Sequence, residues 1–290
     1  MTAWKLGIIG GSGLYDIDAL EAVQSDWPDT PWGKPSAPLQ SGSLNGVDLV
    51  FLPRHGLGHR LSPSDVNYRA NIAALKRVGC TDILSVSAVG SLQETYAPGD
   101  FVLVDQFIDR TFKRQKSFFG AGCVAHVGLA DPVCARLSAL VGQAAKAAGA
   151  VIHRGGTYLA MEGPQFSTRA ESHLYRAWGC DVIGMTNMPE AKLAREAELP
   201  YASLAMVTDY DCWRAETEAV SVEAVLEILH SNAARARTSL SHLAKTLCET
   251  PRTPSPQGIE RALDYAIITA PDGRDPSLVE SLKMIAGRVL

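Results

Sequence analysis

The chain has 290 residues, of which 46% are hydrophobic and 20% are charged, and its formal net charge is -4. These values are typical of a globular protein with a sizeable core, and the net charge gives no electrostatic reason to expect binding to nucleic acid or to an acidic membrane. No apolar run approaches the ~20 residues that a membrane-spanning helix needs, and the N-terminus lacks a signal-peptide pattern, so we expect a cytoplasmic protein.

The six cysteines are scattered along the chain and form no C-x-x-C pair. In a chain of this length that pattern is typical of reduced thiols. His55 and His59 are the nearest approach to a ligand pair, and no matching cysteine or histidine group accompanies them. We therefore expect no metal site.

The first predicted strand covers residues 5–9 and runs into Gly10-Gly11-Ser12-Gly13. A turn of this kind presents backbone N–H groups and a hydroxyl to an anion. The glycine spacing does not fit the dinucleotide-binding pattern G-x-G-x-x-G, so we discount a nicotinamide cofactor. A tight turn without a ligand is the alternative interpretation.

Asn45-Gly46 predicts a hairpin, and its second strand, 47–52, ends shortly before Arg54 and His55. The planar guanidinium of arginine suits phosphate because it donates several hydrogen bonds in a fixed geometry. A surface arginine and a turn histidine are the alternative. A helix is predicted over 66–78, then a strand over 82–87 that ends in a small-residue loop, 88–91.

The second half continues the alternation of helices and strands. The predicted elements are a strand over 101–105, a helix over 132–149, a strand over 151–161, a helix from Thr168 to about Trp178, a strand over 181–185, a helix over 189–199 and a helix over 221–246. Thr168 and Glu171 fit a capping box, and Pro189 is expected at the first position of its helix.

The apolar strand predicted over 201–207 is followed by Asp209 and Asp211. Ligands of open α/β sheets bind at the carboxyl ends of the strands, and residues two apart on a strand share a face, so both carboxylates are expected in one site. Two carboxylates at one site do not both ionise easily, so one can hold a proton for a leaving group. A solvated turn is the alternative.

This alternation predicts a single α/β domain with a central mixed, largely parallel sheet flanked by helices. We assign residues 1–250 to this domain and 251–290 to a C-terminal loop and helix packed on it. Residues 262–270 fit either a strand or a short helix. The residues alone indicate a small-molecule enzyme with an anion site.

Seven motifs stand in order along the chain. They are Gly10-Gly11-Ser12-Gly13, Arg54-His55-Gly56, Asn67-Tyr68-Arg69-Ala70-Asn71, Ala88-Val89-Gly90-Ser91, Glu162-Gly163-Pro164-Gln165-Phe166, Met185-Thr186 and Thr208-Asp209-Tyr210-Asp211-Cys212-Trp213. Together they resemble the methylthioadenosine phosphorylases of the trimeric purine nucleoside phosphorylase family. The resemblance covers about residues 5–248 and is much less clear beyond them.

The resemblance implies roles for individual residues. The residues that would bind phosphate are Ser12, Arg54, His55, Ser87, Ala88 and Thr186. Asp209 and Asp211 would form the catalytic pair that recognises the base, Met185 would contact the sugar, and Phe166 would contact the purine. The 5′ pocket would be lined by Val222, Val225 and His126 of a neighbouring subunit. It also implies a homotrimer or a dimer of trimers.

The implied reaction is phosphorolysis of 5′-methylthioadenosine to adenine and 5-methylthioribose 1-phosphate, with inorganic phosphate as co-substrate and no cofactor. A 6-oxopurine nucleoside or methylthioinosine phosphorylase is an alternative. The resemblance argues against it, because family members that act on 6-oxopurines look to have Asn at the position of Asp209. A phosphate-independent hydrolase and a non-catalytic nucleoside-binding protein are more remote alternatives. No nucleic acid or membrane partner is expected.

Overall fold

The computed structural model describes residues 3–11, 14, 20–214 and 222–290, without the side chains of 222–226. Within these residues, eleven strands form one sheet in the order β2-β3-β4-β1-β5-β10-β9-β7, while β11 pairs with β5 and β6, and β8 pairs with β6. The strands are β1 (Lys5–Gly10), β2 (Glu21–Asp26), β3 (Leu39–Leu44), β4 (Val47–Pro53), β5 (Asp82–Ser91), β6 (Phe101–Val104), β7 (Gln106–Asp109), β8 (Ile152–Arg154), β9 (Thr157–Ala160), β10 (Val182–Gly184) and β11 (Tyr201–Asp209).

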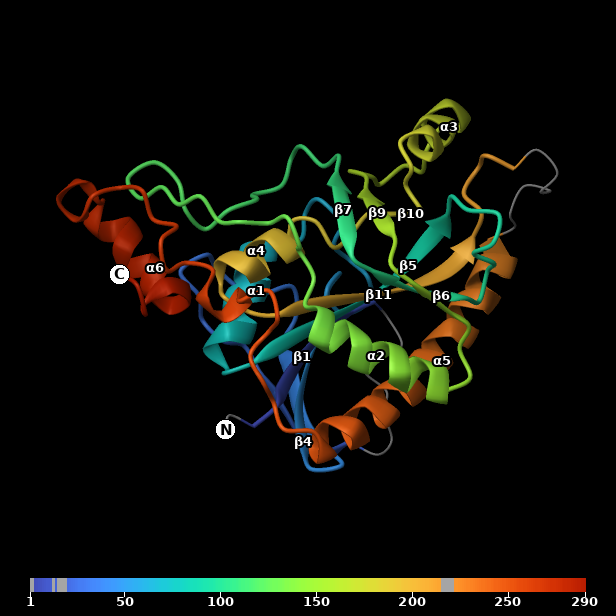
Figure 1. Ribbon diagram of the computed structural model, residues 1–290, viewed down its shortest axis with the longest axis horizontal. Coiled ribbons are helices and arrows are strands. Elements are labelled where there is room, and N and C mark those ends of the chain that lie inside the picture. The colour runs from blue at the N-terminus through green and yellow to red at the C-terminus, as the bar shows by residue number, and fades with distance from the viewer. Residues whose placement is uncertain (1–2, 12–13, 15–19, 215–221) are drawn as a thin grey trace.

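Helices cover the sheet (Figure 1). They are α1 (Tyr68–Arg77), α2 (Ala135–Ala147), α3 (Arg169–Ala177), α4 (Glu190–Glu196), α5 (Val222–Glu249) and α6 (Pro276–Ala286), with the 3-10 turns η1 (Ile259–Arg261) and η2 (Pro271–Gly273). In the described residues no helix is long and apolar enough to cross a membrane. The predicted mixed, largely parallel α/β fold is confirmed, because β1, β4, β5 and β11 run parallel while the hairpins at the edge run antiparallel.

Strand β11 shows how the sheet separates two cores. Leu204 and Met206 pack in the core that includes α2 and α5, whereas Ala205 and Val207 pack in the core that includes α1, α4 and α6. Successive side chains of a strand point to opposite faces, so the continuous apolar run reflects burial on both faces. This is the reason that the run predicted a strand inside a parallel sheet.

Several local predictions are confirmed by the geometry. The Asn45-Gly46 hairpin joins β3 to β4 with positive φ angles of 51° and 78°. The helix predicted over 66–78 is present as α1, which begins after its N-cap Asn67, whose side chain accepts from the Ala70 N–H at 3.1 Å. The capping box predicted for α3 is present in both directions, with Thr168 and Glu171 bonding each other's backbone N–H.

Other predictions were wrong at the boundaries. The loop expected over 88–91 is the end of β5, because this stretch pairs with both β10 and β11. The strand expected over 151–161 breaks at Gly155 and Gly156, whose φ angles are 79° and 152°, so that β8 joins β6 and β9 joins β7. Pro189 is the N-cap of α4 and not its first residue.

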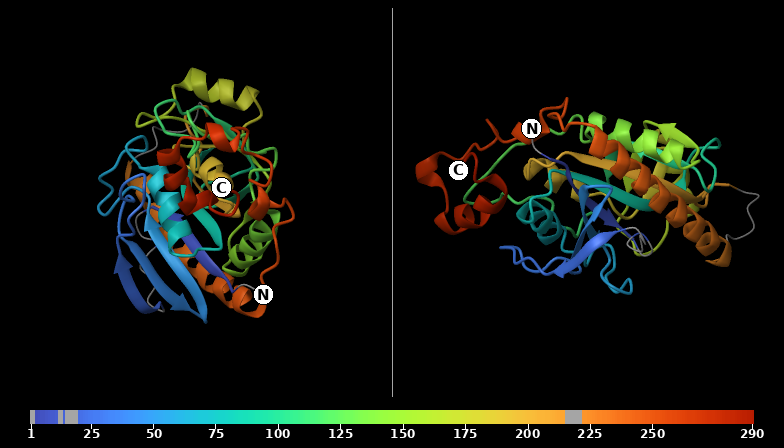
Figure 2. Two further views of the ribbon diagram at one scale, coloured as in Figure 1. Left: turned by 90° about the vertical axis from the view of Figure 1, so that its left-hand side faces the viewer. Right: turned by 90° about the horizontal axis from the view of Figure 1, so that it is seen from below.

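Residues 262–270 form neither a regular strand nor a helix but turns and a single bridge between Ile267 and Ala125. Leu263 and Ile285 nevertheless join the α1/α4 core. Figures 1 and 2 show that the C-terminal segment and the loop between β7 and α2 project together from one end of the molecule. We call residues 117–130 and 259–290 the C-terminal lobe. The domain boundary placed at residue 250 stays a prediction.

Candidate active site

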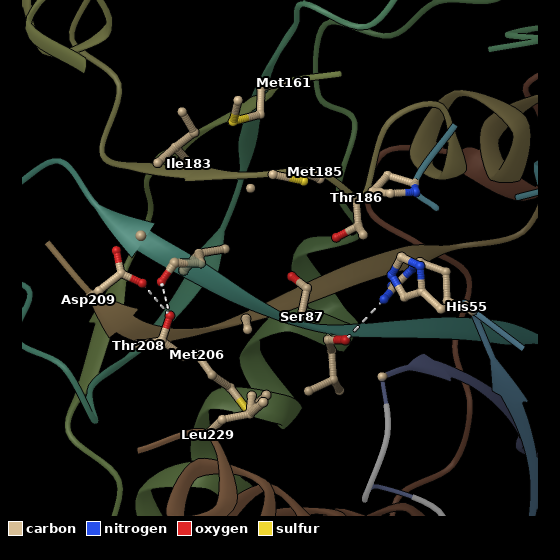
Figure 3. A pocket seen from close by; sticks show the side chains of 18 of the residues that line it. His55, Ser87, Met161, Ile183, Met185, Thr186, Met206, Thr208, Asp209 and Leu229 are labelled. Carbon is tan, nitrogen blue, oxygen red and sulfur yellow. Dashed lines mark hydrogen bonds between the residues drawn. The ribbon is translucent and has the colours of Figure 1, made fainter. Parts of the chain in front are cut away.

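The carboxyl ends of β1, β4, β5 and β11 surround a cavity of about 340 Å³ (Figure 3). The end of β10 and the first half of α5 complete its wall, and the lining includes Leu229 and Ala233 of α5. This position, at the carboxyl edge of parallel strands, is where the sequence placed the site. Arg54 lies at one end of the cavity and Asp209 lies at the other.

Arg54 follows β4 and is enclosed, with 1% of its surface exposed. Its guanidinium forms a two-point ion pair with Glu190: Nε donates to Oε1, and Nη2 donates to Oε2 at 3.2 Å. Nη2 also donates to Ser85 Oγ at 2.6 Å. Burial by itself lowers the pKa of Arg54, but the Glu190 carboxylate outweighs burial and raises it, so the guanidinium stays charged.

The neighbouring imidazole of His55 is neutral at physiological pH. Burial and then the positive charge of Arg54 lower the pKa of His55 to about 4. Its Nδ1 lies 3.0 Å from the Leu61 carbonyl oxygen, so Nδ1 carries the proton and donates it. Nε2 is then an acceptor, which suits the hydroxyl of a partly protonated phosphate.

Ser87 lies on β5 between the two ends of the cavity. Its hydroxyl is buried and has no hydrogen-bond partner among the described residues. A buried hydroxyl without a partner is costly unless a ligand or water satisfies it. Ala88 lines the cavity beside Ser87, and Thr186 lines it from the end of β10, where its Oγ1 lies 3.2 Å from the Tyr158 hydroxyl.

The acidic end is formed by Asp209 and Asp211. Asp209 accepts from the Thr208 hydroxyl at 2.7 Å and from the Asp211 N–H at 2.7 Å. Asp211 Oδ2 is buried without a hydrogen-bond partner in the described structure. Burial raises the pKa of the Asp211 carboxyl, the neighbouring Ser172 hydroxyl lowers it by less, and the nearby charge of Asp209 raises it again, so that the pKa is raised on balance.

The two carboxylates share the site for a reason that differs from the expected one. Strand β11 ends at Asp209, and Asp211 has a positive φ of 51°, so the chain turns instead of continuing as a strand. Asp209 also lies close to β5, since a Cβ at Gly90 would come within 3.1 Å of its Oδ1. Trp213 anchors the turn: its Nε1 donates to Ser91 O at 2.8 Å, and Arg176 stacks 3.6 Å from its ring.

The middle of the cavity is apolar. Met161, Ile183, Met185, Met206 and Leu229 line it, as Figure 3 shows. Phe166 also lines the cavity, but 84% of its surface is exposed. An aromatic ring with this exposure has a free face on which a planar ligand can stack.

Three predicted ligands lie outside the described side chains: Ser12, Val222 and Val225. His126 is described and does not line the cavity; it lies in the C-terminal lobe, where its backbone N–H donates to Ala266 O at 2.8 Å. The remaining predicted residues all line the one cavity.

Sequence reasoning missed several residues of the site. Glu190 reads in the sequence as an ordinary acidic residue in the first turn of a helix, and its partner Arg54 is 136 positions away. Met206 and Leu229 read as core residues of a strand and a helix. Tyr158 gives no signal of its own, although the lack of a side chain at Gly184 leaves room for it, since a Cβ there would overlap the Tyr158 hydroxyl.

No group of three or more potential metal ligands occurs among the described residues. The cavity lining instead offers hydroxyls, two imidazoles, a paired guanidinium and two carboxylates. This donor set suits an anion at one end and a hydrogen-bonding heterocycle at the other, with an apolar sugar-sized region between them.

A sequence profile of the phosphorylase superfamily matches residues 5–247, so the chain belongs to that superfamily. The chain is 60% identical to S-methyl-5′-thioadenosine phosphorylase of Cereibacter sphaeroides, over 98% of both chains. The crystal structure of a methylthioadenosine phosphorylase sourced from an antarctic soil metagenomic library superposes with a TM-score of 0.91, at 47% identity and over 98% of this chain and 99% of that one. The predicted family resemblance is confirmed.

A second solved structure carries a ligand. Methylthioadenosine phosphorylase from Schistosoma mansoni in complex with adenine superposes with a TM-score of 0.82, at 37% identity and over 98% of both chains. These likenesses extend beyond residue 247, where the match to the superfamily profile ends, into the C-terminal segment.

Proposed function

We propose that the chain catalyses the phosphorolysis of 5′-methylthioadenosine to adenine and 5-methylthioribose 1-phosphate. The observation that carries this proposal is a cavity that has Arg54 and His55 at one end, Asp209 and Asp211 at the other, and the unpartnered Ser87 hydroxyl between them, all among the described residues. Near full-length similarity to enzymes named for this activity supports it.

The phosphate end would hold the nucleophile. Phosphate would accept hydrogen bonds from Ser87, Thr186 and the backbone N–H of Ala88, all of which border the cavity. An oxygen of the held phosphate attacks C1′ of the sugar while the bond from C1′ to N9 of the base breaks. The negative charge of phosphate stabilises the positive charge that develops on the sugar, and we assign the contact with the sugar to Met185, which lines the cavity.

The acidic end would take the base. The electron pair of the broken bond moves into the purine, and a proton delivered to N7 neutralises it. We assign that donation to Asp209, with Asp211 sharing the proton of the pair. A carboxylate also accepts from the 6-amino group of adenine, and Phe166 would stack against the purine ring.

The alternative is phosphorolysis of a 6-oxopurine nucleoside or of methylthioinosine. The carboxylate of Asp209 argues against it, because O6 of such a base needs a hydrogen-bond donor, and a mismatched buried pair disfavours the wrong substrate by several orders of magnitude. Non-catalytic nucleoside binding is a remote third candidate, and it predicts no release of base at all.

The test is the release of free base from methylthioadenosine, adenosine and methylthioinosine, each with and without phosphate. We expect adenine from methylthioadenosine only when phosphate is present. Phosphate-independent release would identify a hydrolase, and preference for methylthioinosine would reject the role of Asp209. No release from any substrate would leave a binding protein.

We further propose a homotrimer in which His126 contributes to the pocket of a neighbouring copy. His126 is tied to the C-terminal lobe, where its backbone N–H donates to Ala266 O at 2.8 Å. The same lobe exposes Tyr265 and Ile268, with 95% and 63% of their surfaces accessible. A neighbouring copy that covered these two side chains would remove their apolar surface from water.

Light scattering of the purified protein tests the assembly. We expect the mass of three chains, or of six if trimers pair, and we expect Tyr265→Glu with Ile268→Glu to reduce the mass and raise the KM for the nucleoside. A monomer with full activity would reject this arrangement. The site would need no cofactor beyond co-substrate phosphate, and we propose that the enzyme works in the cytoplasm without a nucleic acid or membrane partner.

A further inference from the structure

Arg54 is the only lysine or arginine among the described residues that line the cavity. Its charge is already balanced before any ligand arrives, because Glu190 faces it through two oxygens. The adjacent His55 is neutral near pH 7, since its pKa is lowered to about 4, chiefly by burial. Arg54 and His55 therefore offer hydrogen bonds to a ligand but together carry little net positive charge.

Glu190 is held in place from several sides. It has no exposed surface, and its Oε2 accepts from the Tyr201 hydroxyl at 3.2 Å and from Ser85 Oγ at 3.2 Å. Ser85 in turn lies 2.8 Å from Asn187 Oδ1. A carboxylate fixed in this way cannot turn aside when a ligand approaches, so Arg54 keeps its counter-ion.

We propose that Glu190 is a positioning residue that holds Arg54 and neutralises its charge, so that bound phosphate keeps its own negative charge for the reacting sugar. This inference rests on the proposed phosphorolysis. It assigns Glu190 to the reaction through Arg54, without contact between Glu190 and either substrate.

The physical reason is a balance between affinity and reactivity. An unpaired Arg54 would bind phosphate more tightly in a buried site, where charges interact strongly. The same attraction would draw phosphate charge away from the sugar, where positive charge develops in the transition state. Glu190 therefore weakens ground-state binding of phosphate and favours the transition state.

The test uses Glu190→Gln in the full-length protein, which keeps the shape of the side chain and removes its charge. Phosphate binding is measured by calorimetry without nucleoside, and phosphate KM and kcat are measured with saturating methylthioadenosine. We expect the Kd and KM for phosphate to fall about tenfold and kcat to fall about tenfold or more, since one buried charge of the pair is lost. We also expect phosphate to raise the Tm of the variant more than that of the wild type.

Asp82→Asn is the matched control. Asp82 lies at the other end of β5, is fully buried and pairs with Arg252 at 2.5 Å, so its loss removes a buried carboxylate far from the cavity. We expect it to lower the Tm without changing the Kd for phosphate. An unchanged or higher Kd for phosphate in Glu190→Gln would overturn the proposal. A lower Tm with an unchanged Kd for phosphate and an unchanged kcat would overturn it as well.

Tyr201→Phe removes one hydrogen bond to Glu190 and serves as the milder variant if Glu190→Gln does not fold. We expect the phosphate KM and kcat each to fall about twofold, as for partial loss of one hydrogen bond. If kcat fell without a fall in the phosphate KM, the inference would be rejected. If the wild type binds phosphate but cleaves no nucleoside, the proposed function fails, while the calorimetric comparison still decides whether Glu190 limits phosphate affinity.

Discussion

The two ends of the cavity are built in opposite ways. At the phosphate end, Arg54 and Glu190 are fully buried and bonded to each other and to Ser85 before a ligand arrives. At the base end, Asp211 has a carboxylate oxygen without a partner among the described residues, and Phe166 is largely exposed. The first end is therefore fixed by folding, and the second has groups that the ligand can complete.

Because of this contrast, we expect mutations at the two ends to differ in their effect on folding stability. A substitution in the network of Arg54, Glu190 and Ser85 is expected to change folding stability together with activity, because removing one member leaves another buried group without its hydrogen-bond partner. A substitution at the base end changes activity with little change in stability. Single substitutions can therefore test each side of the contrast.

The largest expected effect is that of Asp209→Asn. An amide cannot give a proton to N7, so we expect kcat for methylthioadenosine to fall by about a hundredfold to ten-thousandfold, as is usual for loss of a general acid. The relative use of 6-oxopurine nucleosides should rise, because an amide can donate to O6. Steady-state kinetics with methylthioadenosine and methylthioinosine measure both changes.

Asp272→Asn is the control for this variant, since Asp272 is an exposed carboxylate in η2. It should leave both substrates unaffected. If Asp209→Asn retained the selectivity of the wild type, the role of Asp209 in base recognition would be rejected.

The next effect is a pH dependence that originates at His55. Its pKa is about 4 in the folded protein, against 6.5 for the unperturbed group, so the unfolded chain binds more protons between these values. The neutral ring contributes up to about 3 kcal/mol to the free energy of unfolding. This contribution is fully present above about pH 6.5 and is lost as the pH falls through about 4.

Urea unfolding at about pH 7.5 and about pH 4.5, on either side of the unperturbed pKa, measures this contribution in the wild type and in His55→Gln. We expect the variant to lose less stability on acidification than the wild type does. His242→Gln, at an exposed position of α5, should respond to pH as the wild type does. An equal loss in His55→Gln and the wild type would contradict the neutral, buried state of His55.

The sequence predicted the architecture well where a local pattern reports burial directly. The run 201–207 and the Thr168 capping box predicted β11 and the start of α3, because period and cap chemistry are local properties. The break at Gly155-Gly156 was missed although a Gly-Gly pair is a local turn signal, and this break lets β8 pair with β6 while β9 pairs with β7.

The site was predictable to a similar degree. Arg54, His55 and Asp209 follow strands whose ends meet in a parallel sheet, so their convergence follows from the topology. Glu190 was not predictable in this way, because a helix start explains an acidic residue without any partner. The turn at Asp211 was also hidden, since positive φ at an aspartate depends on the surroundings.

Ser87→Ala tests the middle of the cavity, with a smaller effect. The hydroxyl has no partner within the described part of the protein, so its removal should leave the free energy of unfolding nearly unchanged. If it binds phosphate, the phosphate KM should rise about tenfold, the usual effect of a lost hydrogen bond to a charged group. Phosphate titrations and urea unfolding measure the two quantities.

Ser91→Ala is the matched change on the same strand. Its hydroxyl is buried and donates to Gln93 O at 2.8 Å, so we expect a loss of about 1 kcal/mol in stability and no change in phosphate KM. If Ser87→Ala resembled Ser91→Ala, the hydroxyl of Ser87 would be structural and would not bind phosphate.

The smallest expected effect is that of Phe166→Ala at the open end. Because 84% of this side chain is exposed, its removal should not change the Tm. Loss of one stacking face should raise the nucleoside KM about fivefold to tenfold, in line with about 1 kcal/mol for an aromatic contact. Leu174→Ala, an exposed apolar residue of the nearby α3, should change neither quantity. A fall in Tm with an unchanged KM would show that Phe166 belongs to the folded framework, and the contrast between a fixed end and an open end would then not hold.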